Sequence, residues 1–193
     1  MITPSPERAT ARPPRRPAPS IETNRLSLTP LRASDLDALI AVYGDPRSAR
    51  MTHAIPHPLT RDDAEKLLVK MMATEKTHWA IRLEDEHLIG VISLKKTTCG
   101  KPAGLDCFGP NLSVFVAPAF QGHGYGVEAM DGLLKLCKKR RLHRVVHAAH
   151  FADNEASGRA LIAADFLYTG RRTMETSLAR DGEHMALHMI RIL

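Results

Sequence analysis

A glycine-rich segment after the middle of the chain has the composition of an anion-binding loop. It runs from Gln121 to Gly126 (QGHGYG) and separates an apolar segment, which ends at Pro118, from an amphipathic helical pattern. Glycine residues let the main chain adopt positive φ and let a ligand approach the backbone closely. The free N–H groups at a helix start and the positive end of its dipole favour phosphate oxygens. The segment predicts a site for a phosphate-bearing ligand, with a ligand-free glycine turn as the simpler alternative.

The spacing of these glycines excludes two common nucleotide-binding loops. A dinucleotide-binding fingerprint needs G-x-G-x-x-G, whereas Gly122, Gly124 and Gly126 alternate. A Walker loop needs a Lys followed by Ser or Thr, and that pair does not follow here. A phosphate-bearing ligand would therefore be held by another kind of loop.

A second segment places polar side chains where a strand pattern ends and a helix pattern begins. His150 closes the strand pattern, and Asp153 or Asn154 suits the helix N-cap. Ser157 lies in the first turn of the expected helix. Capping alone explains the residue types near the helix start, so by itself this segment favours a structural role.

Together the segments resemble the GNAT acyltransferase superfamily, whose members use acetyl-coenzyme A, and its RimJ/RimL-like branch, which modifies protein N-termini and similar amines. Four segments carry the resemblance: the opening Glu22-Thr-Asn-Arg-Leu26, the hairpin over 79–92, the pyrophosphate loop Gln121–Gly126 with its Q/R-x-x-G-x-G/A pattern, and Asn154-x-x-Ser157 with Phe166 closing the helix. The resemblance covers about residues 21–193. Four segments in the right order are more specific than any one of them.

The resemblance implies where acetyl-CoA would bind as co-substrate. In this family the strand before the loop splays from its neighbour, so that its free main-chain groups hold the acyl carbonyl and the pantetheine arm. Asn154 would bond the pantetheine, and Ser157 would lie nearest the sulfur as a hydrogen-bond donor or general acid. The cofactor-binding residues implied are Val114, Phe115, Val116, Gln121, Gly122, His123, Gly124, Tyr125, Gly126, Val127, Asn154 and Ser157.

The base that would take the proton of the amine has to be found separately. Many relatives carry an acid on the strand before the loop, whereas residues 111–113 read Asn-Leu-Ser here. Asn cannot accept a proton at neutral pH, and His150 ends the neighbouring strand and titrates in the useful range. We therefore take Ser157 and His150 as the candidate catalytic residues, with a packed or surface histidine as the alternative for His150.

A metal site is not expected. In a strand, His143 and His147 face one way and His150 the other, so the three cannot share a metal ion. The cysteines Cys99, Cys107 and Cys137 show no ligand spacing. Acetyl-CoA is therefore the only co-substrate or cofactor that we expect.

Hydrophobic periodicity predicts the elements that position these residues. The expected order is a strand (25–31), a helix from Ser34 to Gly44, a helix from Thr60, a hairpin (79–83, 88–94), a strand (112–116), a helix (126–140), a strand (144–150), a helix to Ala164, and a strand pair (166–171, 184–192) around Asp181 and Gly182. This order predicts a mixed sheet with helices on its faces. With the resemblance it implies an α/β (α+β) fold, a mostly antiparallel central sheet of about seven strands flanked by about four helices. Asp165 stands where relatives usually carry Gly, so we expect a left-handed residue there at a modest cost in stability.

Composition limits the class of protein and its partners. The chain has 193 residues, 44% of them hydrophobic and 25% charged, which suits one soluble globular domain and a tail. The longest uncharged stretch, 107–127, contains prolines and glycines and cannot be a membrane span. An odd number of cysteines fits a reducing compartment, and no signal-peptide pattern is present, so we expect a cytoplasmic protein without membrane partners.

The net charge of +6 belongs to two separate segments rather than to one surface. Residues 1–20 hold six prolines and four arginines against one acid, so we expect a disordered tail followed by an acetyltransferase domain over 21–193. Residues 135–144 hold six further basic residues, which favour the C-terminal dipole end of the expected helix. Nucleic acid is therefore not expected as a partner.

We conclude from the sequence that the protein is an acetyl-CoA-dependent N-acetyltransferase. The acceptor would be a primary amine, either a protein N-terminus or a small molecule, attacking directly in a ternary complex. Two alternatives stay open: a non-catalytic acyl-CoA-binding protein, and a ribosome- or nucleic-acid-associated protein acting through its basic tail. The identity of the acceptor and the formation of a homodimer also stay open.

Overall fold

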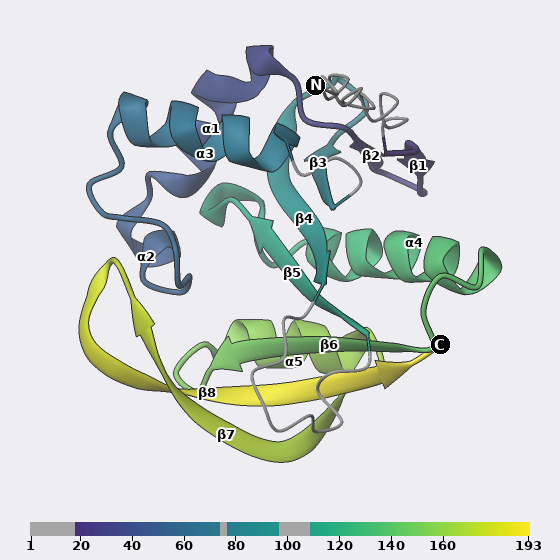
Figure 1. The fold of residues 1–193 in the computed structure, drawn as a ribbon. Coiled ribbons are helices and arrows are strands. Elements are labelled where there is room, and N and C mark those ends of the chain that lie inside the picture. The colour runs from purple at the N-terminus through teal and green to yellow at the C-terminus, as the bar shows by residue number, and fades with distance from the viewer. Residues whose placement is uncertain (1–17, 74–76, 97–108) are drawn as a thin grey trace, which may run out of the picture.

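The computed structural model describes residues 18–73, 77–96 and 109–193 (Figure 1). The strands are β1 (Ile21–Glu22), β2 (Ser27–Thr29), β3 (His78–Arg82), β4 (Leu88–Lys96), β5 (Pro110–Val116), β6 (Val145–Phe151), β7 (Leu167–Ser177) and β8 (Arg180–Ile192). The helices are α1 (Leu36–Tyr43), α2 (Pro46–Ala49), α3 (Arg61–Ala73), α4 (Tyr125–Lys139) and α5 (Glu155–Ala163), with short 3-10 turns at Ala33–Asp35 and Pro118–Phe120. The predicted mixed α/β fold is confirmed, and two short elements, β1 and α2, were not predicted.

The described strands form one sheet in the order β1-β2-β3-β4-β5-β6-β8-β7. Every neighbouring pair is antiparallel except β5 and β6, which are parallel. The prediction of a mostly antiparallel sheet is therefore confirmed. No helix in the described part of the chain is long and apolar enough to cross a membrane.

Helices cover the two faces of the sheet unequally. On one face Leu133 of α4 packs in a cluster with Ile92 of β4 and Val146 of β6. On the other face Leu39 of α1 packs in a cluster with Val91 of β4. Figure 1 shows α4 and α5 behind the sheet, and α1 and α3 over its upper part only. The face of β6, β8 and β7 that is turned away from α5 therefore has none of the described helices on it.

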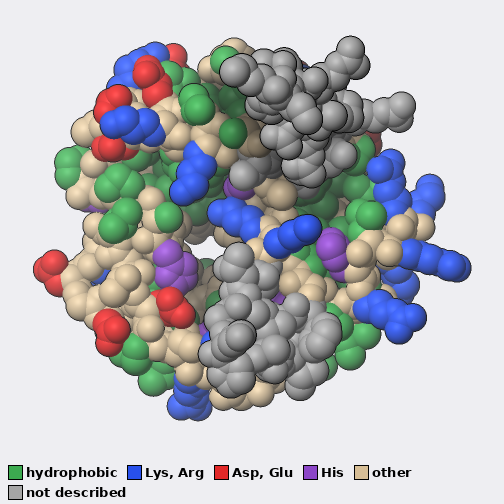
Figure 2. Space-filling model, viewed as in Figure 1, with side chains coloured by type: hydrophobic (Ala, Val, Ile, Leu, Met, Phe, Trp, Pro, Cys, Tyr) green, Lys and Arg blue, Asp and Glu red, His purple; other side chains and the backbone are tan. Residues whose placement is uncertain are grey.

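Strands β5 and β6 meet at one end and diverge. On its other side β5 pairs with β4 along its whole length, from Pro110 opposite Lys96 to Val116 opposite Gly90. With β6 it shares a single registered position, Asn111 opposite His147. Figure 2, in the same orientation as Figure 1, shows a hollow at the centre of this face, with histidine and Lys or Arg side chains at its rim. The splayed strand pair that the resemblance implies is present.

Local signals at three helix ends act as the sequence predicts, whereas Ser34, the expected start of the first helix, lies in the 3-10 turn before α1. Thr60 precedes α3, and its hydroxyl accepts a hydrogen bond from the Asp63 N–H at 3.1 Å and donates one to the Asp63 carboxylate at 2.6 Å. Asn154 caps α5 by accepting a hydrogen bond from the Ser157 N–H. Asp165, just after α5, has φ of 57°, so the predicted left-handed residue is present.

The last hairpin differs from the prediction. Asp181 and Gly182 were expected in its loop, but they lie inside β8, and the turn is Leu178–Ala179. The register jumps from Thr176 opposite Glu183 to Ser177 opposite Arg180, so Asp181 and Gly182 form a bulge. Gly182 has φ of 73°, which is the conformation that such a bulge requires. The Asp-Gly pair is thus a bulge signal here and not a turn signal.

The N-terminal boundary of the fold lies slightly before the predicted one. Ala18 is buried in the larger core cluster, and the Trp79 indole N–H donates to the Pro19 carbonyl at 3.0 Å. Ala18 and Pro19, which fall in the predicted tail of residues 1–20, therefore contact the fold, and residues 1–17 lie outside the described residues.

Candidate active site

The glycine-rich loop has the geometry of an anion-binding helix start. Gly122 and Gly124 both have positive φ, 81° and 79°, and Gly124 is the N-cap of α4. The Gln121 side-chain amide donates to the Val116 carbonyl at 2.8 Å, which ties the loop to the end of β5. Among the residues that the structure describes, no acceptor bonds the main-chain N–H groups of 122–127. These N–H groups are available to the oxygens of a phosphate.

Arg25 and Glu128 hold the loop against the opening of the domain. The Arg25 guanidinium contacts the Glu128 carboxylate at 2.7 Å, donates to the His123 carbonyl at 3.1 Å, and lies 4.7 Å from the centre of the Tyr125 ring. The Thr23 hydroxyl donates to the same carboxylate at 2.7 Å. Burial alone would raise the pKa of Glu128, but hydrogen bonds from Thr23 and Arg25 outweigh it and lower that pKa. The motif around Arg25 was visible in the sequence, whereas its partner Glu128 was missed.

The edge of β5 that faces β6 supplies the main-chain groups that the resemblance implies. Val114, Phe115 and Val116 are half-buried and pair with β4 on their other side. Because β6 has diverged at this level, the N–H and carbonyl groups on the open edge have no strand partner in the described sheet. They can bind a linear, amide-containing ligand as an extra strand would.

Asn154 and Ser157 lie on the other side of the opening, after the end of β6. The Asn154 side-chain oxygen accepts from the Ser157 N–H at 3.1 Å, so its NH₂ group is left as a donor. Ser157 is half-buried, and its hydroxyl has no hydrogen-bond partner among the described residues. Both side chains are thus available for the roles predicted for them, which stay predictions.

His150 is buried beneath α5. One ring nitrogen, Nδ1, lies 2.8 Å from the Phe151 carbonyl, and Nε2 lies 2.9 Å from the Tyr168 hydroxyl. A Cβ placed on Gly158 would lie 3.0 Å from the ring, so α5 packs directly on it. Both nitrogens therefore have protein partners, which favours the packed-histidine alternative over a role as base.

The opposite face of the sheet carries a group of aromatic and basic side chains. The Arg180 guanidinium lies 4.3 Å from the centre of the Phe151 ring and donates to Asp153 at 2.6 Å. Its side chain is only 3% exposed, and its Nε and Nη2 have no partner in the described part of the chain. The His53 ring lies 4.7 Å from that of Phe151, and its Nδ1 lies 3.1 Å from the Thr176 carbonyl. These contacts fix the last hairpin to the segment that leads into α5.

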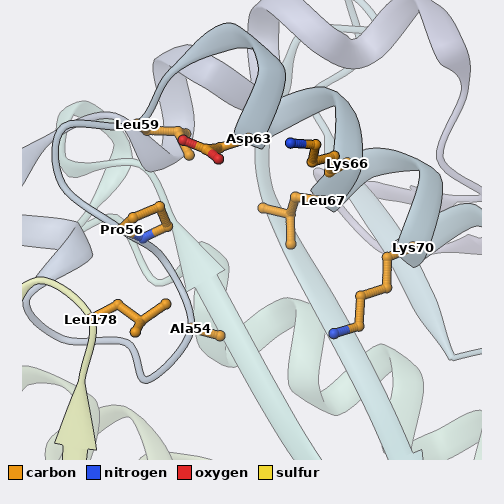
Figure 3. A pocket seen from close by; sticks show the side chains of 8 residues that line it. All are labelled: Ala54, Pro56, Leu59, Asp63, Lys66, Leu67, Lys70 and Leu178. Carbon is orange, nitrogen blue, oxygen red and sulfur yellow. The ribbon is translucent and has the colours of Figure 1, made fainter.

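Two cavities are found in the described part of the protein, and one of them adjoins the loop. One of about 680 Å³ lies beside the loop, between α4 and the β1–β2 turn, and is lined by Thr23, Gly124 and Lys135 among others. The second, of about 260 Å³, lies between α3, the segment before it and the hairpin turn (Figure 3). Its lining combines Leu59, Leu67 and Leu178 with charged residues of α3, Asp63, Lys66 and Lys70. In the described residues no group of His, Cys, Asp and Glu could hold a metal ion.

Comparisons with known proteins agree with this geometry. Residues 25–166 match the sequence profile of the acetyltransferase (GNAT) domain, and no curated protein matches the chain. An acetyltransferase of the GNAT family from Bacillus anthracis has the same fold, with a TM-score of 0.73, 17% identity, and coverage of 90% of this chain and 98% of that one. Mycobacterium smegmatis RimJ in complex with CoA-disulfide gives a TM-score of 0.73 at 16% identity over 90% of this chain and 87% of that one.

A third solved structure, the microcin C7 self-immunity acetyltransferase MccE in complex with acetyl-CoA and AMP, gives a TM-score of 0.72 at 10% identity over 88% of this chain and 93% of that one. These likenesses show the fold, and the profile match over most of the chain shows the family. The chain belongs to the GNAT acetyltransferase family.

Proposed function

We propose that the protein transfers an acetyl group from acetyl-CoA to a primary amine by direct attack in a ternary complex. The observation that carries the proposal is the joining of two features at one place. The loop that carries the free N–H groups of residues 122–127 is hydrogen-bonded to the carbonyl of Val116, the last residue of β5. At this end β5 has diverged from β6. Pyrophosphate on the loop and an acyl-pantetheine arm along β5 form one continuous ligand.

The residues around the opening meet the needs of thioester aminolysis. The reaction requires proximity of amine and thioester, a donor for the developing oxyanion, and a proton for the leaving thiolate. Main-chain N–H groups on the open edge of Val114–Val116 are the proposed oxyanion donors. The Asn154 NH₂ group would bond the pantetheine, and the Ser157 hydroxyl would donate to the sulfur.

The acceptor amine would approach from the face opposite α4 and α5. That face is where Figure 2 shows the hollow, and the cavity of Figure 3 adjoins it at the hairpin turn. The Leu178 N–H bonds the His53 carbonyl at 3.2 Å, so the cavity and the aromatic group around Phe151 form one surface. A protein N-terminus and a small-molecule amine are both acceptors of the proposed class.

Binding of acetyl-CoA to a Gly124→Val variant tests the loop assignment. Gly124 has φ of 79°, a conformation that a β-branched residue rarely adopts, so valine must distort the loop. Calorimetry should show affinity reduced by at least about tenfold, which corresponds to about 1.4 kcal/mol. Gly170→Val is the matched control, because Gly170 has φ of 80° with nothing within 4 Å and lies in β7.

The two variants share a backbone cost, so any difference between them reports the loop itself. Equal affinity of both variants for acetyl-CoA would contradict the loop assignment. Tight acetyl-CoA binding by the unaltered protein, with no thiol release in a broad panel of amines, would instead support a non-catalytic acyl-CoA-binding protein.

A further inference from the structure

A chain of three side chains lies on the last two strands. The His188 Nε2 is 2.8 Å from the Thr173 hydroxyl, and that hydroxyl donates to the Glu175 carboxylate at 2.9 Å. His188 is in β8, and both Thr173 and Glu175 are in β7. All three side chains are half-buried, so they are neither free surface groups nor sealed in the core.

The pairing of the strands places His188 on the acceptor face. His188 lies opposite Ala149 of β6, and its neighbour Met189 lies opposite Ala148. Met189 and Ala148 are in the core cluster beneath α4 and α5, so the His188 side chain points to the other face. Ala149 follows the last position at which β5 and β6 pair, Asn111 opposite His147. His188 is thus one strand away from the opening between β5 and β6.

The hydrogen bonds determine which ring nitrogen carries the proton. A carboxylate only accepts, and Thr173 has a single hydroxyl proton, which it donates to Glu175. The Thr173 oxygen must therefore accept from the Nε2–H of His188. In the neutral ring Nδ1 is then unprotonated, and it has no hydrogen-bond partner among the described residues. In hydrolase triads a carboxylate bonded directly to the imidazole fixes its tautomer, and here Glu175 would do so through the Thr173 hydroxyl.

We infer that His188 is the general base of the acetyl transfer, with Thr173 and Glu175 as positioning residues. The inference rests on the proposed function, since it assigns the base for that reaction. His188 differs from His150, the base expected from the sequence. Both ring nitrogens of His150 have protein partners, and its ring lies beneath α5, on the other face of the sheet.

The step transfers one acyl group and one proton, with no change of oxidation state. The amine nitrogen forms its bond to the thioester carbon while one N–H proton moves to Nδ1 of His188. The resulting imidazolium is stabilised by the Thr173 hydroxyl and the Glu175 carboxylate behind it. The tetrahedral intermediate expels the thiolate, which takes the proton of the Ser157 hydroxyl. The His188 proton passes to water, and water restores the proton of Ser157. The net change is amine plus thioester to amide plus thiol.

The surroundings of His188 lower its pKa and so favour the neutral ring. Burial is the main cause that lowers its pKa, and Arg171 of β7, His147 of β6 and His53 lower it further. Glu175 is the one described group that raises it. Because the neutral ring is the active form, kcat/KM should fall as the pH falls through this lowered pKa, which lies below the ordinary value for histidine. Glu175→Gln should move that fall to still lower pH.

The tautomer can be measured without an acceptor. In protein labelled with ¹⁵N-histidine, long-range proton–nitrogen spectra distinguish a protonated from an unprotonated ring nitrogen, and His188→Gln assigns the signals. We expect a protonated Nε2 and an unprotonated Nδ1 at pH 7, and a loss of that preference in Thr173→Val. A protonated Nδ1 in the unaltered protein would overturn the inference.

Kinetics then test the role. With an amine that the unaltered protein acetylates, His188→Gln should lower kcat/KM for that amine by about 10²- to 10⁴-fold, the usual contribution of a general base. Its acetyl-CoA affinity should not change. His184→Gln is the matched control, since His184 lies on the same strand and the same face, its ring packs against Phe151, and its Nε2 lies 2.9 Å from the Asp181 carbonyl and not from Thr173.

The outcomes separate the two proposals. If acetyl-CoA does not bind, or binds but no amine is acetylated, the proposed function is contradicted, and the role of His188 with it. Transfer by the His188→Gln variant at the rate of the unaltered protein contradicts the role of His188 alone. The role is also contradicted if His188→Gln loses activity but kcat/KM of the unaltered protein does not fall as the pH is lowered, because the base must be neutral to act.

Discussion

At the scale of single residues, Asp165 adopts a left-handed backbone conformation that glycine usually occupies. It is the left-handed residue after α5, with φ of 57°, and its carboxylate is 3.4 Å from Arg191 while remaining 81% exposed. Such an exposed ion pair contributes little, whereas a left-handed conformation is costly for a residue with a Cβ.

Asp165→Gly should therefore raise the free energy of unfolding by about 0.5–1 kcal/mol, measured in urea. Asp165→Ala is the control: it removes the ion pair but keeps the strained conformation, and it should not stabilise. A glycine variant less stable than the unaltered protein would show that the contact with Arg191 outweighs the strain.

At the scale of single residues, the sequence predicted the features that depend on neighbouring positions in the chain. Alternate glycines, the capping pair of Thr60 and Asp63, and the N-cap Asn154 depend on neighbours within a few positions. Glu128 and His188 were missed as functional residues for the opposite reason. Their partners Arg25 and Thr173 are brought to them by packing across the chain or by strand register, which periodicity does not specify.

At the scale of elements, a buried ion pair fixes the first strands to the segment before α1. The Arg82 Nη2 contacts both Asp35 oxygens at 2.8 Å, its Nε donates to the Thr29 hydroxyl at 2.9 Å, and the two charged side chains are 4% and 6% exposed. Removing one member of such a pair leaves an uncompensated buried charge.

Asp35→Asn should accordingly lower the free energy of unfolding by about 3–5 kcal/mol in urea denaturation. Asp37→Asn is the matched control, because the Asp37–Arg61 pair is exposed and should contribute less than about 1 kcal/mol. Equal effects of the two substitutions would contradict the structural role given to the buried pair.

Element types and order followed from periodicity, whereas strand length and pairing did not. The expected strands over 166–171 and 184–192 became β7 and β8, which extend to a two-residue turn because the Asp181-Gly182 bulge lets pairing continue past it. The divergence of β5 and β6 is a property of the whole sheet. Only the resemblance to a family, and not the pattern of residues 110–116, indicated it.

At the scale of the whole molecule, the sheet separates the two proposed binding surfaces. The loop and the start of α4 lie at the end of β5, while His188, Phe151 and the hairpin face away from α4 and α5. The opening between β5 and β6 connects the two surfaces (Figure 2). This arrangement lets two substrates meet without displacing each other, which is what a ternary-complex reaction requires.

The central claim is that an amine attacks acetyl-CoA directly while both are bound. Its most direct test is the initial rate of thiol release, measured against acetyl-CoA at several fixed concentrations of an amine taken from a panel of peptides and small molecules. Intersecting double-reciprocal lines, with no thiol release when amine is omitted, are the expected result. Parallel lines, which indicate an acetylated enzyme, or no release with any amine would contradict the claim.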